Sequence, residues 1–250
     1  VDHYALRGGN DDVYIEGIDD EFSLLTIEQW GKGETDEDYF DLEVNDGVFA
    51  GDADELDIVL NNAGAGRVQV PARTLDNDVL GGGSSLSESI EGEFGYLDIY
   101  NESGDDVIEV FNIESTGGSA RGNFLKFYDG HEVATTLNIS GDTKLSLNFS
   151  NADDNDVLAT VDASGLNADL FLRGLDSMVD LSITGAQGDN DIAGGSYEIG
   201  SNTDVFTNKT ITTFDGDDII RAGYGDATID AGDGNNEIHA GSARNVDITT

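Results

Sequence analysis

Short runs of alternating apolar and polar residues recur along this chain. They are clearest at residues 136–149, 157–172 and 179–184. Alternation with a period of two is typical of half-buried β-strands. Clusters of Gly, Asn, Asp and Ser separate these runs, as turns do in β-rich proteins. The pattern therefore predicts an all-β protein.

A second pattern, with a period of nine, occupies residues 213–241. Three successive units read TFDGDDIIR, AGYGDATID and AGDGNNEIH. The fourth residue of each unit is glycine and the eighth is isoleucine, at Gly216, Gly225 and Gly234 and at Ile220, Ile229 and Ile238. Glycine allows the backbone of a tight turn, and the isoleucine faces inward from a short strand. The period predicts a parallel β-roll.

Two units make one coil of such a roll, so turns on the same edge are two units apart in the sequence. This spacing pairs the turn of Asp218 with the turn of Asn236, both at the sixth position of a unit. On the opposite edge Ala227 pairs with Asn245, where neither position carries a carboxylate. One good site for a cation is therefore expected on the first edge, and a doubtful one on the second.

The three units resemble the RTX (repeat-in-toxin) nonapeptide family, with the consensus G-G-x-G-x-D-x-U-x, where U is a large aliphatic residue. The first consensus glycine is replaced here by Thr213, Ala222 and Ala231. The resemblance implies calcium binding, and Ca²⁺ takes six to eight oxygens from carboxylates, carbonyls and waters. Asp218 is the foremost predicted ligand. The other ligands expected in the repeats are Asp217, Gly216, Asp215, Asn236, Gly234 and Asp233.

Related acidic turns, each leading into an aliphatic residue, lie outside the repeats. They occur at residues 9–13, 76–80, 104–108, 154–158 and 188–192. We add Asp11, Asp106, Asp156 and Asn190 from them as further candidate calcium ligands. Asp and Asn are also ordinary turn residues, so any single copy is equally well explained as a plain turn.

The net charge of −41, from 52 acidic against 11 basic residues, limits the possible partners. It excludes an ordinary nucleic-acid-binding protein and disfavours anionic membranes. Self-repulsion destabilises the compact state, and bound cations would relieve it. The alternative is a solvated acidic surface, as in proteins adapted to high salt. A hydrophobic content of 38% argues against a disordered acidic chain.

The chain contains no cysteine, which removes disulfides and thiol chemistry. No apolar run reaches the length of about 18 residues that a membrane span requires, so no transmembrane segment is expected. The sequence opens on Val1 without an N-terminal signal peptide, and we interpret it as a processed chain or an excerpt. Proteins with RTX repeats typically leave the cell by type I secretion, which uses a C-terminal signal.

Three regions are predicted. Residues 1–120 are β-rich, either a sandwich or an irregular solenoid; 24–30 form a strand or short helix, and 34–41 an exposed loop. Residues 121–200 form a β-solenoid with coils of roughly 20–30 residues, and 201–250 form the roll. Residues 160–166, with the strands that follow and GAQGDNDIAGG, resemble bacterial surface-layer proteins that carry RTX-type repeats.

No catalytic constellation is recognisable. The histidines, His3, His131 and His239, lie in no nucleophile or metal motif. The seven arginines and four lysines are scattered singly, which disfavours enzymes acting on acidic polysaccharides. We therefore expect no enzymatic activity. A calcium-assisted carbohydrate enzyme is left as a remote alternative.

The sequence thus predicts an extracellular, calcium-binding structural protein at the cell surface, most simply a surface-layer component. Its expected partners are further copies of itself and a cell-surface polysaccharide. The alternative is an RTX-type adhesin or a fibre or tail appendage segment that binds a glycan or a protein.

Overall fold

The computed structural model describes residues 3–9, 13–18, 22–30, 38–44, 55–61, 63, 95–101, 108–118, 122–128, 133–150, 157–175, 177–195, 207–241 and 245–250. This part of the chain contains strands and no helix. The odd-numbered strands are β1 (His3–Gly9), β3 (Leu24–Trp30), β5 (Glu55–Asn61), β7 (Val110–Thr116), β9 (Thr136–Gly141), β11 (Thr160–Leu166), β13 (Leu181–Thr184), β15 (Lys209–Thr212), β17 (Ala227–Asp230) and β19 (Val246–Thr249). The even-numbered strands are β2 (Val13–Ile18), β4 (Asp38–Val44), β6 (Gly95–Asn101), β8 (Asn123–Tyr128), β10 (Leu145–Ser150), β12 (Leu170–Arg173), β14 (Asn190–Ala193), β16 (Ile219–Arg221) and β18 (Glu237–His239).

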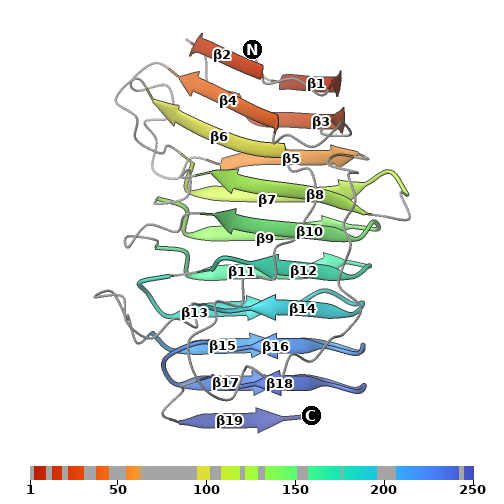
Figure 1. Cartoon of the computed structure of the whole chain (residues 1–250), viewed down its shortest axis with the longest axis vertical. Helices are drawn as coiled ribbons and strands as arrows, with labels where there is room; N and C mark the ends of the chain where they lie inside the picture. Colours follow the sequence, from red (N-terminus) through yellow and green to blue (C-terminus); the bar gives the residue numbers. More distant parts are fainter. Residues whose placement is uncertain are drawn as a thin grey trace.

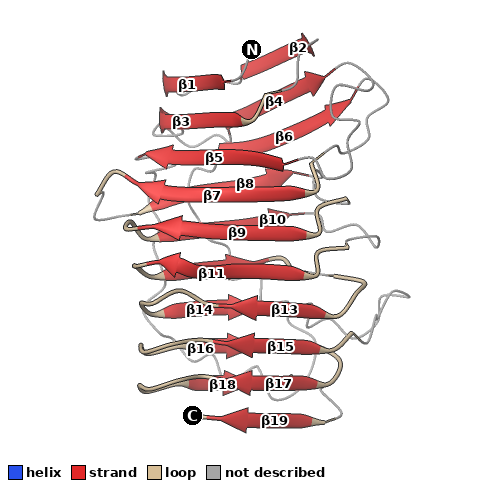
Figure 2. Ribbon diagram, turned by 180° about the vertical axis from the view of Figure 1, so that it is seen from behind, coloured by secondary structure: helices blue, strands red, loops and turns tan. Residues whose placement is uncertain are grey.

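The chain winds as a parallel β-solenoid with two sheets (Figure 1). The ten odd-numbered strands form one sheet, here sheet A, and the nine even-numbered strands form the other, sheet B. Strands stack in chain order, so that each coil adds one strand to each sheet (Figure 2). The predicted all-β solenoid is confirmed. Strands near the N-terminus pair in parallel as well, so an irregular solenoid describes this half better than a sandwich of antiparallel sheets.

The lengths of the coils agree with the predicted solenoid in the middle of the chain and the predicted roll at its C-terminal end. In the middle of the chain Thr136 pairs with Thr160, and Leu181 pairs with Lys209, so these coils have the predicted length of roughly 20–30 residues. In the repeats Ile220 pairs with Ile238, two units later, and the coil is shorter. Sheet A continues without a break from β7 to β15, across the predicted region boundaries near residues 120 and 200.

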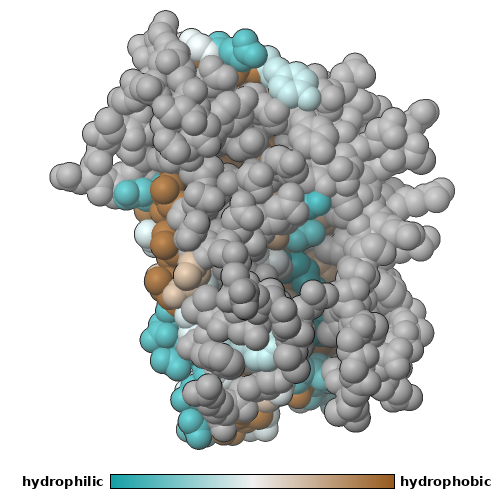
Figure 3. Space-filling view, turned by 60° about the vertical axis from the view of Figure 1, so that its left-hand side comes forward, coloured by the Kyte–Doolittle hydropathy of each residue, from teal (hydrophilic) through white to brown (hydrophobic). Residues whose placement is uncertain are grey.

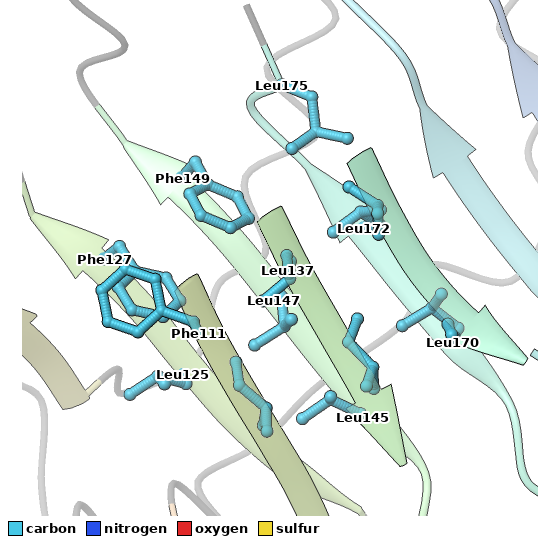
Figure 4. Close-up of a cluster of buried hydrophobic side chains, with 14 of the residues drawn as sticks. Phe111, Leu125, Phe127, Leu137, Leu145, Leu147, Phe149, Leu170, Leu172 and Leu175 are labelled. Carbon is cyan, nitrogen blue, oxygen red and sulfur yellow. The ribbon is translucent and has the colours of Figure 1, made fainter. Parts of the chain in front are cut away.

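In strands such as β5 and β11, alternate residues point between the sheets and form the core. Phe127 stacks on Phe149 with ring centroids 5.0 Å apart and planes at 11°, and Phe111 lies 5.0 Å from Phe127 on the other sheet (Figure 4). Such aromatic pairs add about 0.5–1.5 kcal/mol to the effect of burial. On the side of the molecule in Figure 3, the described surface carries both hydrophilic residues (teal) and hydrophobic residues (brown).

The structure settles whether residues 24–30 form a strand or a helix, and it corrects the loop predicted at residues 34–41. Residues 24–30 form strand β3, because burying Leu25 and Ile27 completely requires the period of two. The acidic segment 34–41, predicted as a loop, instead contains the start of β4 at Asp38. Tyr39 and Phe40 explain the difference, since aromatic residues favour strands.

Candidate cation site in the C-terminal turns

Three stacked turns precede β14, β16 and β18 and define the candidate site. Their innermost residues are Asn190, Asp218 and Asn236, which occupy equivalent positions in successive coils. The backbone N–H of Asp218 donates to Oδ1 of Asn236 at 3.0 Å. Oδ1 of Asp218 accepts from the backbone N–H of Asn190 at 2.8 Å and from its Nδ2 at 2.9 Å. The predicted pairing of the Asp218 and Asn236 turns is therefore observed, and Asn190 joins the same column.

The two asparagines close their own turns with N–H donors. Nδ2 of Asn190 donates to the carbonyl oxygens of Ala186 (3.1 Å) and Gly188 (2.8 Å). Nδ2 of Asn236 donates in the same way to Ala231 (2.9 Å) and Gly232 (3.3 Å). A buried carbonyl needs such a partner, because an unpaired one loses its hydration without compensation. These two turns are thus satisfied by the protein itself.

Asp218 differs because an ionised carboxylate has no N–H to donate. Its side chain is only 1% exposed. Its Oδ2 is buried without a hydrogen-bond partner, and so is Oγ1 of Thr213 at the start of the same turn. The carbonyls equivalent to those of Ala231 and Gly232, one coil earlier, belong to Thr213 and Phe214. A buried charge without a counter-charge is strongly unfavourable.

These oxygens fit a calcium ion in kind. Ca²⁺ accepts carboxylate, hydroxyl and carbonyl oxygens in a flexible shell. No group of three or more His, Cys, Asp or Glu side chains with metal-binding spacing occurs in the part of the chain that the structure describes. A cation here would therefore rely on one carboxylate, that of Asp218, and otherwise on neutral oxygens.

The backbones of neighbouring turns lie so close together that only glycine fits between them. Gly216 and Gly234 have φ of +141° and +137°, and a Cβ on Gly234 would lie 1.9 Å from the carbonyl oxygen of Gly216. The predicted residues Asp215 and Asp233 have exposed side chains, and the carbonyl of Asp233 accepts from the N–H of Gly216 at 3.0 Å. The candidates Asp11, Asp106 and Asp156 lie outside the described residues.

A second, outer column runs beside the first and consists of Asp169, Asp189, Asp217 and Asn235. The backbone N–H of each of the last three residues donates to Oδ1 of the residue one coil earlier, at 3.2 Å for Asp189 and 2.9 Å for Asp217 and Asn235. Nζ of Lys144 lies 3.6 Å from Oδ2 of Asp169 at one end. Three carboxylates therefore follow one another at the strand spacing, an arrangement that destabilises a sheet.

On the opposite edge, where Ala227 provides no carboxylate, a lysine ammonium group contacts the oxygens of the turns. Lys209 is 4% exposed, and its Nζ donates to the carbonyl oxygens of Thr207 (3.0 Å) and Tyr224 (2.6 Å) and to Oγ1 of Thr207 (2.8 Å). Lys209 is in register with Ala227, the sixth residue of its unit. Lys209 was not identified from the sequence as a residue of this edge, although it lies one coil before Ala227.

The outer residues of this edge pair acid with amide. Asn208 donates to Asp180 from its backbone N–H (2.8 Å) and from Nδ2 (3.1 Å), and Asn245 does the same to Asp226. The backbone hydrogen bond from Asn208, followed by its side-chain hydrogen bond, lowers the pKa of Asp180 below its ordinary value.

The register of sheet B also places two arginines that are distant in the sequence beside the same aspartate. Arg173 and Arg221 both contact Oδ1 of Asp191, at 2.7 and 2.6 Å, and each is 17% exposed. The guanidinium of Arg173 stacks over Phe171 at 3.9 Å. The cluster ties three coils together. The coils that separate its strands differ in length, so no fixed period in the sequence could have revealed it.

Comparison with known proteins does not assign the chain to a family. No protein-family model, curated protein or solved structure matches the chain. Within the described residues, no helix has the length and apolar character needed to cross a membrane.

Proposed function

We propose that this chain is an extracellular, calcium-binding structural protein, a component of a self-assembling surface layer. The observation that carries the proposal is the buried Asp218 carboxylate, whose Oδ2 has no partner in a column of stacked turns. The net charge of −41 supports it, because a compact solenoid of this charge gains from bound cations.

In this proposal the carboxylate of Asp218 holds the ion, together with Oγ1 of Thr213 and the carbonyls of the same turn. Calcium supplies positive charge where the described chain provides none. Sites in extracellular modules typically bind Ca²⁺ with Kd of about 10⁻⁴–10⁻³ M. The chain would therefore stay loose in a calcium-poor cell interior and tighten after type I secretion. Further copies then assemble on it at the cell surface, beside a surface polysaccharide.

An adhesin or appendage segment is the second candidate, and one surface favours it. Thr160, Ser182, Thr210 and Thr228 form an exposed column of hydroxyls across four neighbouring strands of sheet A. Hydroxyls at the regular spacing of a sheet, about 4.7–4.9 Å, offer hydrogen bonds to a neutral glycan. The column lacks aromatic platforms, and so it is a weaker basis than the buried acid.

Light scattering during a calcium titration of the EDTA-treated chain tests the proposal. Growth of large assemblies that EDTA reverses supports a calcium-driven surface layer. Compaction of a chain that remains monomeric keeps calcium as a folding ligand and favours the adhesin. No change in size or compactness contradicts both the calcium site and the assembly.

A further inference from the structure

We propose that side-chain nitrogens replace the cation in three of the four described C-terminal turns, so that these four turns together bind one calcium ion. The four turns are 185–190, 213–218, 222–227 and 231–236. The inference rests on the proposed calcium-binding function. It adds the number of sites and the residues that decide where a cation is needed.

Two turns are closed by amides. In turns 185–190 and 231–236, Nδ2 of Asn190 and of Asn236 each donates to two carbonyl oxygens of its own turn. A cation bound to those oxygens would satisfy the same lone pairs from the same side of the turn. The amide does this without charge and without an ion, because Asn carries two N–H donors where Asp carries none.

One turn is closed by an ammonium group. Ala227 leaves turn 222–227 without a side chain that could reach its carbonyls, and Lys209 of the preceding coil enters instead. Its Nζ donates to oxygens of both coils, Thr207 and Tyr224. A covalently attached cation thus bridges two turns, as a bound metal ion would.

The fourth turn, 213–218, has neither an amide side chain at its sixth residue nor a lysine in register with it one coil earlier. Its sixth residue is an acid that accepts from Asn190 and leaves Oδ2 buried and unpaired. Thr213 adds a second buried oxygen without a partner. The choice between Asn and Asp at this position, two side chains of nearly the same shape, therefore decides whether a turn is self-sufficient or takes an ion.

Isothermal titration of the full EDTA-treated chain with CaCl₂ tests the inference by counting high-affinity sites. Asp218→Asn should bind one ion fewer than the wild-type chain and still fold without calcium, as judged by its β-sheet circular dichroism. Asn236→Asp should bind one ion more than the wild type, because the change recreates the open turn one coil later. Asp189→Asn is the matched control in the outer column and should bind as many ions as the wild type.

The outcomes separate the two proposals. No binding to the wild-type chain overturns the proposed function. The same number of bound ions in Asp218→Asn as in the wild type overturns the single-site inference and leaves calcium binding intact. An Asn236→Asp chain that folds but gains no site contradicts the claim that the amide replaces a cation.

Discussion

The backbone N–H of Asp218 donates to Oδ1 of Asn236 across 3.0 Å, although the two residues are far apart in the sequence. One full coil lies between them, so the bond links turns that are stacked along the solenoid. Asn190 lies on the other side of Asp218, and its side-chain amide donates to the carboxylate, which is almost completely buried. In the proposed function, this burial is the reason why the carboxylate takes a cation, since bulk water does not reach it.

Replacing Lys209 by methionine should destabilise the chain, with or without calcium. The carbonyls of Thr207 and Tyr224 would lose a buried donor, and each unpaired buried group costs about 1–3 kcal/mol. Urea unfolding measures the loss. Lys144→Met is the control, because the contact of Lys144 with Asp169 is partly exposed and such pairs contribute about 0–1 kcal/mol. Equal effects of the two changes would contradict the role given to Lys209.

Replacing Asp189 by asparagine should stabilise the chain at low salt. Asp189 lies between Asp169 and Asp217 in the outer column, and asparagine keeps the Oδ1 that accepts from Asp217. Relief of like charges in adjacent strands is worth about 0.2–1 kcal/mol. The gain should shrink in 1 M NaCl, where the Debye length falls to about 3 Å. Thermal unfolding at both salt concentrations provides the measurement, and a gain independent of salt argues against repulsion as the cause.

Replacing Gly234 by alanine should disrupt the stacked turns. Its φ of +137° is unfavourable for other residues, and the new Cβ would lie 1.9 Å from the carbonyl oxygen of Gly216. Strained backbone alone costs about 1–3 kcal/mol, and the clash adds to that. Gly118→Ala is the comparison, because Gly118 also has a positive φ, of +63°, but no atom lies within 4 Å of the new Cβ. The free energy of unfolding should therefore fall more for Gly234→Ala than for Gly118→Ala.

Asp180 provides a prediction for pH. Hydrogen bonds from Asn208 lower the pKa of Asp180 in the folded chain. A lowered folded pKa means that the ionised form contributes to stability above the unfolded pKa. That contribution is lost as the pH falls through the lowered value. Asn208→Ala removes the side-chain donor, so the pKa of Asp180 should move part of the way back, as followed by NMR. An unchanged pKa would show that the side chain of Asn208 has no effect.

The C-terminal roll could be predicted well because its units are contiguous and equal in length. The coil of two equal units was enough to place Asp218 beside Asn236, and the same step backward from Ala227 leads to Lys209. Asn190 could not be placed, because Asp191 pairs with Ile219 across a longer coil than those of the repeats.

The N-terminal half shows why strands are easier to predict than stacking. Alternation of apolar residues identified β3 as a possible strand, since that signal is local. The strand that pairs with β3 could not be predicted, because the length of chain between paired residues varies. Leu24 pairs with Asp57, whereas Glu55 pairs with Val110, across a much longer stretch of chain. Without a fixed period, the register depends on long-range packing of residues such as Leu56 and Phe111.

Hydrogen exchange of the wild-type and Asp218→Ala chains, with and without calcium, tests the central claim most directly. Calcium at 100 times its Kd stabilises the form that binds it by about 2.7 kcal/mol. Amides of residues 213–239 in the wild-type chain should therefore exchange more slowly when calcium is added, by roughly the hundredfold that this free energy represents. The variant should need far more calcium for any protection. Equal protection of both chains by calcium, or none in the wild type, would contradict a cation at Asp218.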